Sequence, residues 1–178
     1  MKILFITLSN IGDCILTLPV LDLLRGKYPQ AKITCLVSSR PKEIFVNNPA
    51  IERVVIFDKQ ASLPEKIKLF CSLSKENFDL VVDLRNSFLG AILAAKKRNS
   101  PLRMIPAKIK HSKDRFLFRA GFSGDLVSSK LYQSLIIMPQ DYKYIEDILS
   151  RHNLLNSNKL ILVSPGARSQ LKCWDKQN

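Results

Sequence analysis

The chain has 178 residues, of which 46% are hydrophobic, and it carries 28 lysines and arginines against 15 aspartates and glutamates. The length corresponds to one domain and an additional shorter segment, and the composition supplies the apolar core for that domain. The composition also excludes a chain that is disordered throughout. The formal net charge of +13 predicts an anionic partner, namely nucleic acid, a phosphorylated substrate or an acidic membrane face, and does not choose among them.

Short β-branched runs alternate with longer helical patterns along the chain, which is typical of a parallel sheet with helices on both faces. The first helix is expected over residues 13–24, kinked at Pro19 and stopped by Gly26. A capping box predicts that another helix begins at Ser62, with Glu65 three residues later. The other helices are expected at residues 41–47, 87–95, 130–138 and 142–152. The strands are expected at residues 3–8, 32–37, 53–57, 80–84, 102–105 and 160–163.

Targeting and redox signals point to the cytoplasm. The first apolar run is interrupted by Asn10, Gly12 and Asp13 before it reaches the length of a signal peptide or membrane anchor. No other window approaches the run of about 18 apolar residues that a membrane span needs. Four widely spaced cysteines without a C-x-x-C pair predict reduced core thiols. They are Cys14, Cys35, Cys71 and Cys173.

The turn after the first strand, residues 8–13, is the first candidate site. In open α/β sheets, ligands bind beyond the carboxyl ends of the strands, where a helix N-terminus offers unpaired N–H groups. Gly12 permits a ligand to approach the backbone closely. Asp13 fits two roles: the N-cap of the helix, which the spacing alone favours, or a general base at the mouth of a cleft.

The loop after the last predicted strand, residues 164–174, is the second candidate site. Gly166 exposes backbone N–H groups, and Arg168 and Lys172 supply charge for a phosphate. An ordinary loop with solvated cations explains the same residues, and composition slightly favours it. The chain has neither a Walker sequence nor a G-x-G-x-x-G motif, so it lacks the fingerprints of an ATPase or a Rossmann dehydrogenase.

Residues 96–119, which we call the basic segment, hold nine lysines and arginines against Asp114 alone. A solvated basic face with its phenylalanines turned to the core explains this composition. Binding of nucleic acid or of an anionic membrane surface is the alternative. Neither of the two histidines, His111 and His152, belongs to a metal motif or a catalytic triad, so we expect no metal.

Three ordered stretches resemble one family. The opening KILFITLSNIGD at residues 2–13, continuing ILTLPVL to KYP at residue 29, resembles the start of the heptosyltransferases of glycosyltransferase family 9. FDLVVDLR at residues 78–85 and ILVSPGA at residues 161–167, followed by Lys172 and Trp174, match later motifs of that family in order and approximate spacing.

The resemblance implies a GT-B architecture, in which two Rossmann-like domains face a cleft. Residues 1–139 would form the acceptor-binding Rossmann-like domain, and residues 140–178 the linker helix, first strand and phosphate loop of an incomplete donor-binding domain. The implied reaction is metal-independent, inverting transfer of a sugar, expected to be heptose, from a nucleotide-diphosphate donor such as ADP-heptose. The implied acceptor is the lipopolysaccharide core with its lipid A, met at the inner membrane surface. No cofactor is implied.

The resemblance also assigns roles residue by residue. Asp13 would be the base that deprotonates the acceptor hydroxyl. The residues expected to bind the acceptor are Asn10, Gly12, Arg85, Lys113 and Arg115. The residues expected to hold the donor diphosphate are Gly166, Ala167, Arg168 and Lys172. The basic segment would then meet phosphates or acidic sugars of the acceptor.

The sequence departs from the family at its end. In the family, the Pro-Gly-Ala motif opens a second domain, most of which does not follow here. Ser164 and Cys173 stand where His or Asn and a basic residue are commoner. We therefore expect a truncated enzyme, the acceptor half, that is inactive alone. The alternative from another class is a noncatalytic Rossmann-like module whose basic segment grips nucleic acid.

Overall fold

The computed structural model describes residues 1–85, 89–100, 103–122, 135–155, 159–164 and 173. The chain divides into two compact units, Met1–Ile136 and Ile137–Asn178. The assignment of an acceptor domain and part of a donor domain to the two parts of the chain stays a prediction.

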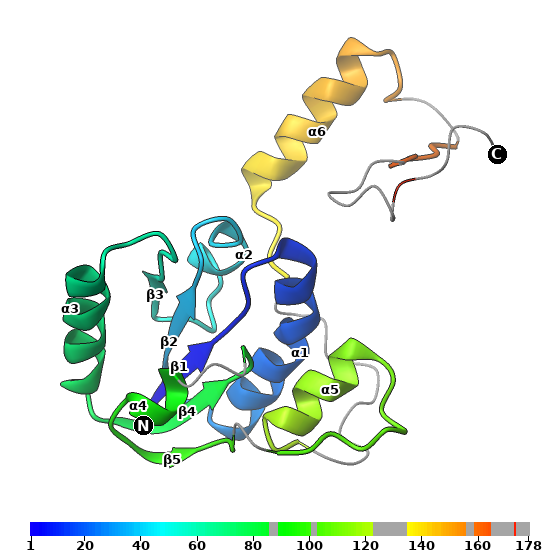
Figure 1. Cartoon of the computed structure of the whole chain (residues 1–178). Coiled ribbons are helices and arrows are strands. Elements are labelled where there is room, and N and C mark those ends of the chain that lie inside the picture. The colour runs from blue at the N-terminus through cyan, green and yellow to red at the C-terminus, as the bar shows by residue number, and fades with distance from the viewer. Residues whose placement is uncertain (86–88, 101–102, 123–134, 156–158, 165–172, 174–178) are drawn as a thin grey trace. The chain divides into compact units, whose positions relative to one another are not determined.

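The first unit is built on a five-stranded parallel sheet in the order β3-β2-β1-β4-β5 (Figure 1). The strands are β1 Lys2–Ile6, β2 Lys32–Val37, β3 Arg53–Ile56, β4 Phe78–Asp83 and β5 Ala95–Arg98. The chain adds β2 and β3 on one side of β1 and then returns to its other side for β4. The strand order therefore reverses between β1 and β4, where Ile6 is in register with Asp83, and this switch point is where open α/β sheets bind ligands.

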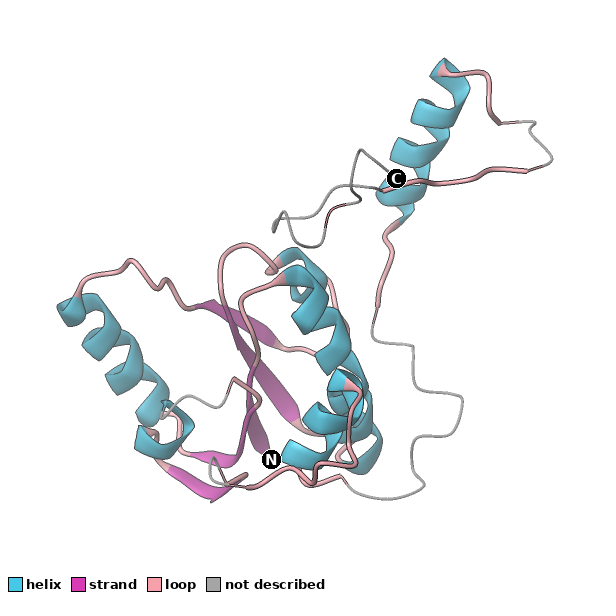
Figure 2. Cartoon of the chain, turned by 45° about the vertical axis from the view of Figure 1, so that its right-hand side comes forward, coloured by secondary structure: helices cyan, strands magenta, loops and turns pink. Residues whose placement is uncertain are grey.

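Helices pack on both faces of this sheet (Figure 2). The helices of the first unit are α1 Ile11–Lys27, α2 Glu43–Val46, α3 Leu63–Ser74, α4 Leu89–Ile92 and α5 Ser112–Arg119. Phe5 of β1 joins Leu21 of α1 and Leu117 of α5 in one core. The next residue of β1, Ile6, joins Leu73 of α3 in the other. Because successive strand residues face opposite sides, this alternation confirms the predicted α/β class with helices on both faces.

The prediction for residues 87–105 is wrong in part. The predicted helix over 87–95 is the short α4, and residues 95–98, which include three cations, form strand β5. Residues 103–105 form no strand. β5 pairs with β4 alone within the described chain, and Lys96 forms an ion pair of 2.7 Å with Asp79. An edge strand of this kind tolerates exposed lysines, so it lacks the apolar pattern that sequence reasoning uses.

Helix boundaries also differ from expectation. α1 continues through Pro19 and Gly26 and ends at Lys27, where the Tyr28 N–H donates to the Leu24 carbonyl at 2.9 Å. Pro29 follows and cannot continue a helix. In α3, the predicted capping box is confirmed, since the Ser62 N–H donates to Glu65 Oε2 at 2.8 Å.

In the second unit, α6 spans Pro139–Arg151, close to the predicted helix, and His152 caps its C-terminus. Residues 135–138 are not helical, against expectation, and residues 130–134 lie outside the described chain. Residues 160–163, expected to be a strand, form none and are exposed. A strand needs a neighbour to pair with, and the described part of this unit offers none.

Two further expectations concern the cysteines and the membrane. Cys14 and Cys35 are buried as predicted, but Cys71 is exposed on α3. Within the described ranges, no helix combines the length and the hydropathy that crossing a bilayer requires.

Asp22 on α1 makes the stability of the fold depend on pH. Partial burial raises the pKa of its carboxyl from 3.8 to about 6, so the folded chain binds a proton more tightly than the unfolded chain. Stability contributed by the protonated form is present below pH 4 and is lost as the pH rises through 6. We expect Asp22→Asn to match wild type near pH 4 and to exceed its free energy of unfolding by about 1 kcal/mol at pH 7, after discounting for solvent screening. Urea unfolding at both pH values measures this, and a difference that does not change with pH would contradict it.

Candidate functional site

The turn between β1 and α1 lies at the carboxyl edge of the sheet, at the switch point. Asn10 has an extended backbone, with φ −102° and ψ 143°, and its carbonyl accepts the first helical hydrogen bond, from the Cys14 N–H at 3.0 Å. Asn10 is therefore the N-cap of α1, and the interpretation of Asp13 as the N-cap is wrong. Asp13 lies in the first helical turn, where helix N–H groups and the helix dipole favour a carboxylate.

The side chain of Asp13 is held by its neighbour. Asn10 Nδ2 donates a hydrogen bond of 3.0 Å to Asp13 Oδ2. Asp13 Oδ1 receives no hydrogen bond from the residues that the structure describes. A half-buried carboxylate with one oxygen fixed and the other open has the arrangement that a general base needs.

A small buried network supports this turn from beneath. The Thr7 and Thr17 hydroxyls lie 3.0 Å apart, and the Thr17 hydroxyl also donates to the Cys14 carbonyl at 2.7 Å. The Cys14 thiol donates to the Leu8 carbonyl at 3.4 Å. Burial raises the pKa of Cys14, which keeps the thiol protonated and able to donate. These bonds join the end of β1 to α1, so the turn that carries Asp13 is firmly held.

Sequence reasoning missed two residues at the same edge. Ser38, directly after β2, donates from its hydroxyl to that of Ser9 at 3.0 Å. Phe57, directly after β3, supports the Arg85 guanidinium, which lies 5.0 Å from its ring centroid. Arg85 follows β4, and β1 and β2 lie between β4 and β3, so its side chain reaches across the edge at the switch point. Ser38 directly follows the predicted strand 32–37, so the rule that ligands bind beyond strand ends could have found it. Phe57 falls inside the predicted strand 53–57, and only the observed end of β3 at Ile56 places it at this edge.

Asp83, at the end of β4, orients the turn that carries Arg85. Its buried carboxylate accepts hydrogen bonds from the Arg85 N–H at 2.9 Å and from the Gly90 N–H at 3.3 Å. The Asn99 side chain pairs with the Asp83 backbone, accepting at 2.6 Å and donating at 2.8 Å. A Cβ on Gly90 would stand 2.9 Å from that of Asp83, so only glycine fits this close approach.

The remaining predicted acceptor residues lie on a different element. Lys113 is in the first turn of α5, where its N–H donates to His111 Nδ1 at 3.2 Å, and Arg115, two residues later, is exposed. Arg119, at the end of α5, donates to the Leu84 carbonyl at 3.1 Å. Burial, and next the nearby Arg115, lower the pKa of Arg119. α5 is thus tied to the residues that follow β4.

The residues predicted to bind the donor lie outside the part of the chain that the structure describes. They are Gly166, Ala167, Arg168 and Lys172. Within the described ranges, no three His, Cys, Asp or Glu side chains gather to hold a metal ion.

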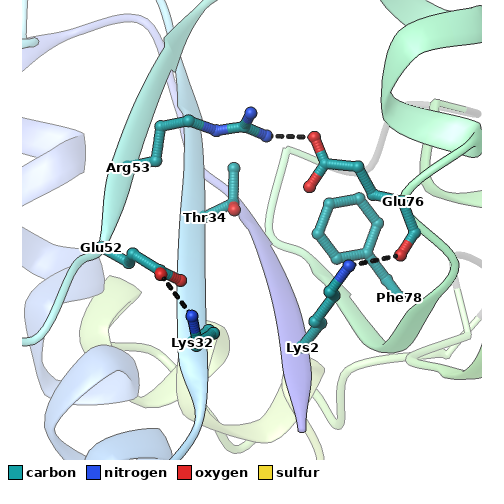
Figure 3. Close-up of a pocket in the computed structure, with 7 residues that line it drawn as sticks. All are labelled: Lys2, Lys32, Thr34, Glu52, Arg53, Glu76 and Phe78. Carbon is teal, nitrogen blue, oxygen red and sulfur yellow. Dashed lines mark hydrogen bonds and ion pairs between the residues drawn. The ribbon is translucent and has the colours of Figure 1, made fainter.

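A cavity of about 380 Å³ lies at the opposite, amino edge of the sheet (Figure 3). Lys32 forms an ion pair of 2.9 Å with Glu52, and Arg53 pairs with Glu76. Lys2 Nζ donates to the Glu76 carbonyl at 3.2 Å. Lys32 and Arg53 neutralise carboxylates of the protein itself, so the cluster braces the strand ends and is a poorer ligand site than the carboxyl edge.

The fold and the edge residues define a Rossmann-like α/β domain with its candidate site at the strand switch point. No family model matches the sequence. The structure is similar to a glycosyl transferase family 9 protein from Veillonella parvula DSM 2008, with a TM-score of 0.75 and 23% identity, covering 98% of this chain and 56% of that one. It is also similar to an E. coli heptosyltransferase solved with ADP-2-deoxy-2-fluoro heptose, with a TM-score of 0.58 and 22% identity over 74% and 52% of the two chains.

The sequence is 28% identical to lipopolysaccharide heptosyltransferase 3 of Escherichia coli over 92% of this chain and 54% of that protein. The chain therefore spans about half the length of the curated relatives it matches. It is homologous to the lipopolysaccharide heptosyltransferases of glycosyltransferase family 9 over that length, and its parallel sheet matches the N-terminal half of GT-B heptosyltransferases.

Proposed function

We propose that this chain supplies the acceptor-binding half of a heptosyltransferase, which transfers heptose from a nucleotide-diphosphate donor to the lipopolysaccharide core. The observation that carries the proposal is the Asn10-held carboxylate of Asp13, at the switch point that Arg85 also crosses. The homologous E. coli enzyme solved with an ADP-heptose analogue supports the class of donor.

In the proposed reaction, Asp13 is the general base. Its open Oδ1 takes the proton of an acceptor hydroxyl while that oxygen attacks the anomeric carbon of the donor sugar. The new oxygen–carbon bond forms as the bond to the diphosphate breaks, so the nucleoside diphosphate leaves with the electron pair and the anomeric configuration inverts. Asn10 fixes the orientation of the carboxylate, and no metal takes part.

We assign the acceptor-binding roles from the side chains at the carboxyl edge of the sheet. Arg85 binds an anionic group of the acceptor, and the hydroxyls of Ser9 and Ser38 bind sugar hydroxyls. Gly12 has nothing within 4 Å of the place where a Cβ would stand, which leaves this space to a ligand. Lys113 and Arg115 meet more distant phosphates of the same acceptor from α5.

The donor side falls to the second unit. Gly166, Ala167, Arg168 and Lys172 hold the donor diphosphate in this proposal. The 178-residue chain does not turn over ADP-heptose alone, since the rest of the donor domain corresponds to the part of the relatives that the match does not cover.

We place the protein in the cytoplasm, in peripheral contact with the inner membrane surface where its lipid-linked acceptor lies. Nucleic acid is not a partner in this proposal. The basic segment is spread over β5, the following loop and α5, and Lys96 and Arg119 are engaged by Asp79 and the Leu84 carbonyl. Nucleic acid binding favours basic side chains clustered along one helix or one face. The described residues of the basic segment do not form such a continuous cluster.

Arg85→Ala tests the acceptor site. The variant loses a charge-assisted contact of about 1.5–3 kcal/mol, so we expect the Kd for phosphorylated lipopolysaccharide core oligosaccharide to rise at least about tenfold in a calorimetric titration. Arg53→Ala, at the amino edge, removes the same charge and serves as the matched control. If the two variants bound the oligosaccharide with equal affinity, the carboxyl edge would not be the acceptor site.

A further inference from the structure

A second cavity, of about 570 Å³, lies between the last turn of α1, the residues after α5 and edge strand β5. We call it the α1–β5 pocket. Its apolar floor includes the buried Leu24 and Val82. Its rim carries four cations, Lys27, Lys97, Arg98 and Arg103. Among its described lining residues there is no carboxylate, in contrast to the compensated cluster at the amino edge.

Aromatic rings orient two of these cations without neutralising them. Lys27 Nζ lies 5.6 Å from the ring centroid of Tyr28 and 5.9 Å from that of Phe122. The Arg103 guanidinium lies 4.3 Å from the ring centroid of Phe118. Cation–π contacts of this kind leave the positive charge available to an anion. Neither cation forms an ion pair within the described residues, so the pocket presents a concentrated positive potential.

The pocket is distinct from the candidate site at the carboxyl edge. Asp13 lies in the first turn of α1 and Lys27 is its last residue. At a rise of about 1.5 Å per residue, the two lie roughly 20 Å apart along the helix axis. The α1–β5 pocket and the Asp13 site are therefore at opposite ends of one rigid element.

We propose that the α1–β5 pocket is a second ligand site, which binds a phosphate-bearing anion. The excess of cations selects a multiply charged anionic group, for which arginine and lysine side chains are the usual partners. The apolar floor accommodates an organic portion attached to that group. The cavity volume falls in the range of about 300–1,000 Å³ that small-molecule sites occupy. This proposal goes beyond sugar transfer and does not depend on it.

A titration of the complete 178-residue chain with inorganic pyrophosphate at low salt tests the pocket. We compare wild type with Lys27→Gln/Arg103→Gln, and with Lys59→Gln/Lys68→Gln as a control that loses the same charge elsewhere. We expect saturable binding to wild type and control, at least tenfold weaker binding to the pocket variant, and a Kd that rises with salt. Arg85→Ala is expected to weaken pyrophosphate binding far less than the pocket variant does, which separates this site from the acceptor site. If the double variant does not fold by circular dichroism, Lys97→Gln, at an exposed edge position, replaces it.

Three results would overturn the proposal. The first is the absence of saturable pyrophosphate binding to wild type. The second is equal affinity of the pocket and control variants for pyrophosphate, or a loss of pyrophosphate affinity in Arg85→Ala and not in the pocket variant. The third comes from vesicles of phosphatidylglycerol and phosphatidylcholine. In that result, the vesicles bind wild type and bind the pocket variant more weakly, while pyrophosphate binds neither protein. The cations would then contact a lipid surface and would not form a phosphate pocket.

Discussion

Asp13→Asn is expected to reduce kcat for sugar transfer by about 10²–10⁴-fold in an enzyme whose acceptor-binding half is this chain, because the amide cannot accept the hydroxyl proton. The substitution keeps the size of the side chain and an oxygen that can accept the hydrogen bond from Asn10. We therefore expect the Kd of the acceptor to change little. Steady-state transfer of labelled heptose, together with a separate acceptor titration, measures the two quantities.

Asn10→Ala is the companion to that experiment. It leaves the carboxylate in place but removes the 3.0 Å hydrogen bond that fixes it, so the loss in kcat should be smaller than for Asp13→Asn. If Asp13→Asn retained full transfer, Asp13 would have no role as the base. A larger loss for Asn10→Ala than for Asp13→Asn would assign the chemistry to Asn10 or to the turn itself.

Asp83→Ala is expected to lower the free energy of unfolding by about 3 kcal/mol. The substitution leaves the buried N–H of Gly90 and the partly buried N–H of Arg85 without their acceptor, and a buried group left so costs about 1–3 kcal/mol. The turn that carries Arg85 loses its anchor at the same time, so the affinity for the acceptor should fall as well. Chemical denaturation and an acceptor titration check the two effects.

Asp79 provides the control on the same strand. Its carboxylate forms an ion pair with Lys96 and accepts a hydrogen bond of 2.8 Å from the Lys2 N–H, both at the exposed surface. Exposed contacts of this kind contribute little to stability. Asp79→Ala should therefore cost much less stability than Asp83→Ala and should not change acceptor binding. If both variants lost a similar amount of free energy of unfolding, Asp83 would act only through its negative charge on β4 and not through its hydrogen bonds.

The sequence predicts those parts of the fold that local rules determine. Residues 32–37 form a strand with the predicted ends, because residues 33–37 are buried on both faces and all but Thr34 are apolar. The capping box at Ser62 places the start of α3 correctly, because its hydrogen bonds span only three residues. β5 and α5 were not predicted because their many lysines and arginines interrupt the apolar periodicity from which strands and helices are predicted. Lys96 and Arg119 gain partners, Asp79 and the Leu84 carbonyl, that only the folded chain brings near.

The candidate site divides in the same way. Asn10, Gly12 and Asp13 could be selected from sequence because one strand-to-helix turn holds them. The approach of Arg85 to Phe57, and of Ser38 to Ser9, depends on the strand order. That order is set by long-range pairing, which no short motif encodes. The structure also divides the basic segment, which the sequence presents as one feature, between the α1–β5 pocket and α5.

A side-by-side titration of the 178-residue chain with three ligands tests the central claim most directly. The ligands are phosphorylated lipopolysaccharide core oligosaccharide, ADP-heptose and duplex RNA. The acceptor half of a heptosyltransferase should bind the oligosaccharide saturably, and Arg85→Ala should weaken this binding. Any binding of ADP-heptose through the α1–β5 pocket should instead be weakened by Lys27→Gln/Arg103→Gln and unchanged in Arg85→Ala, and RNA should not bind with comparable affinity. Tight RNA binding with a steep dependence on salt, together with no binding of the oligosaccharide, would contradict the account.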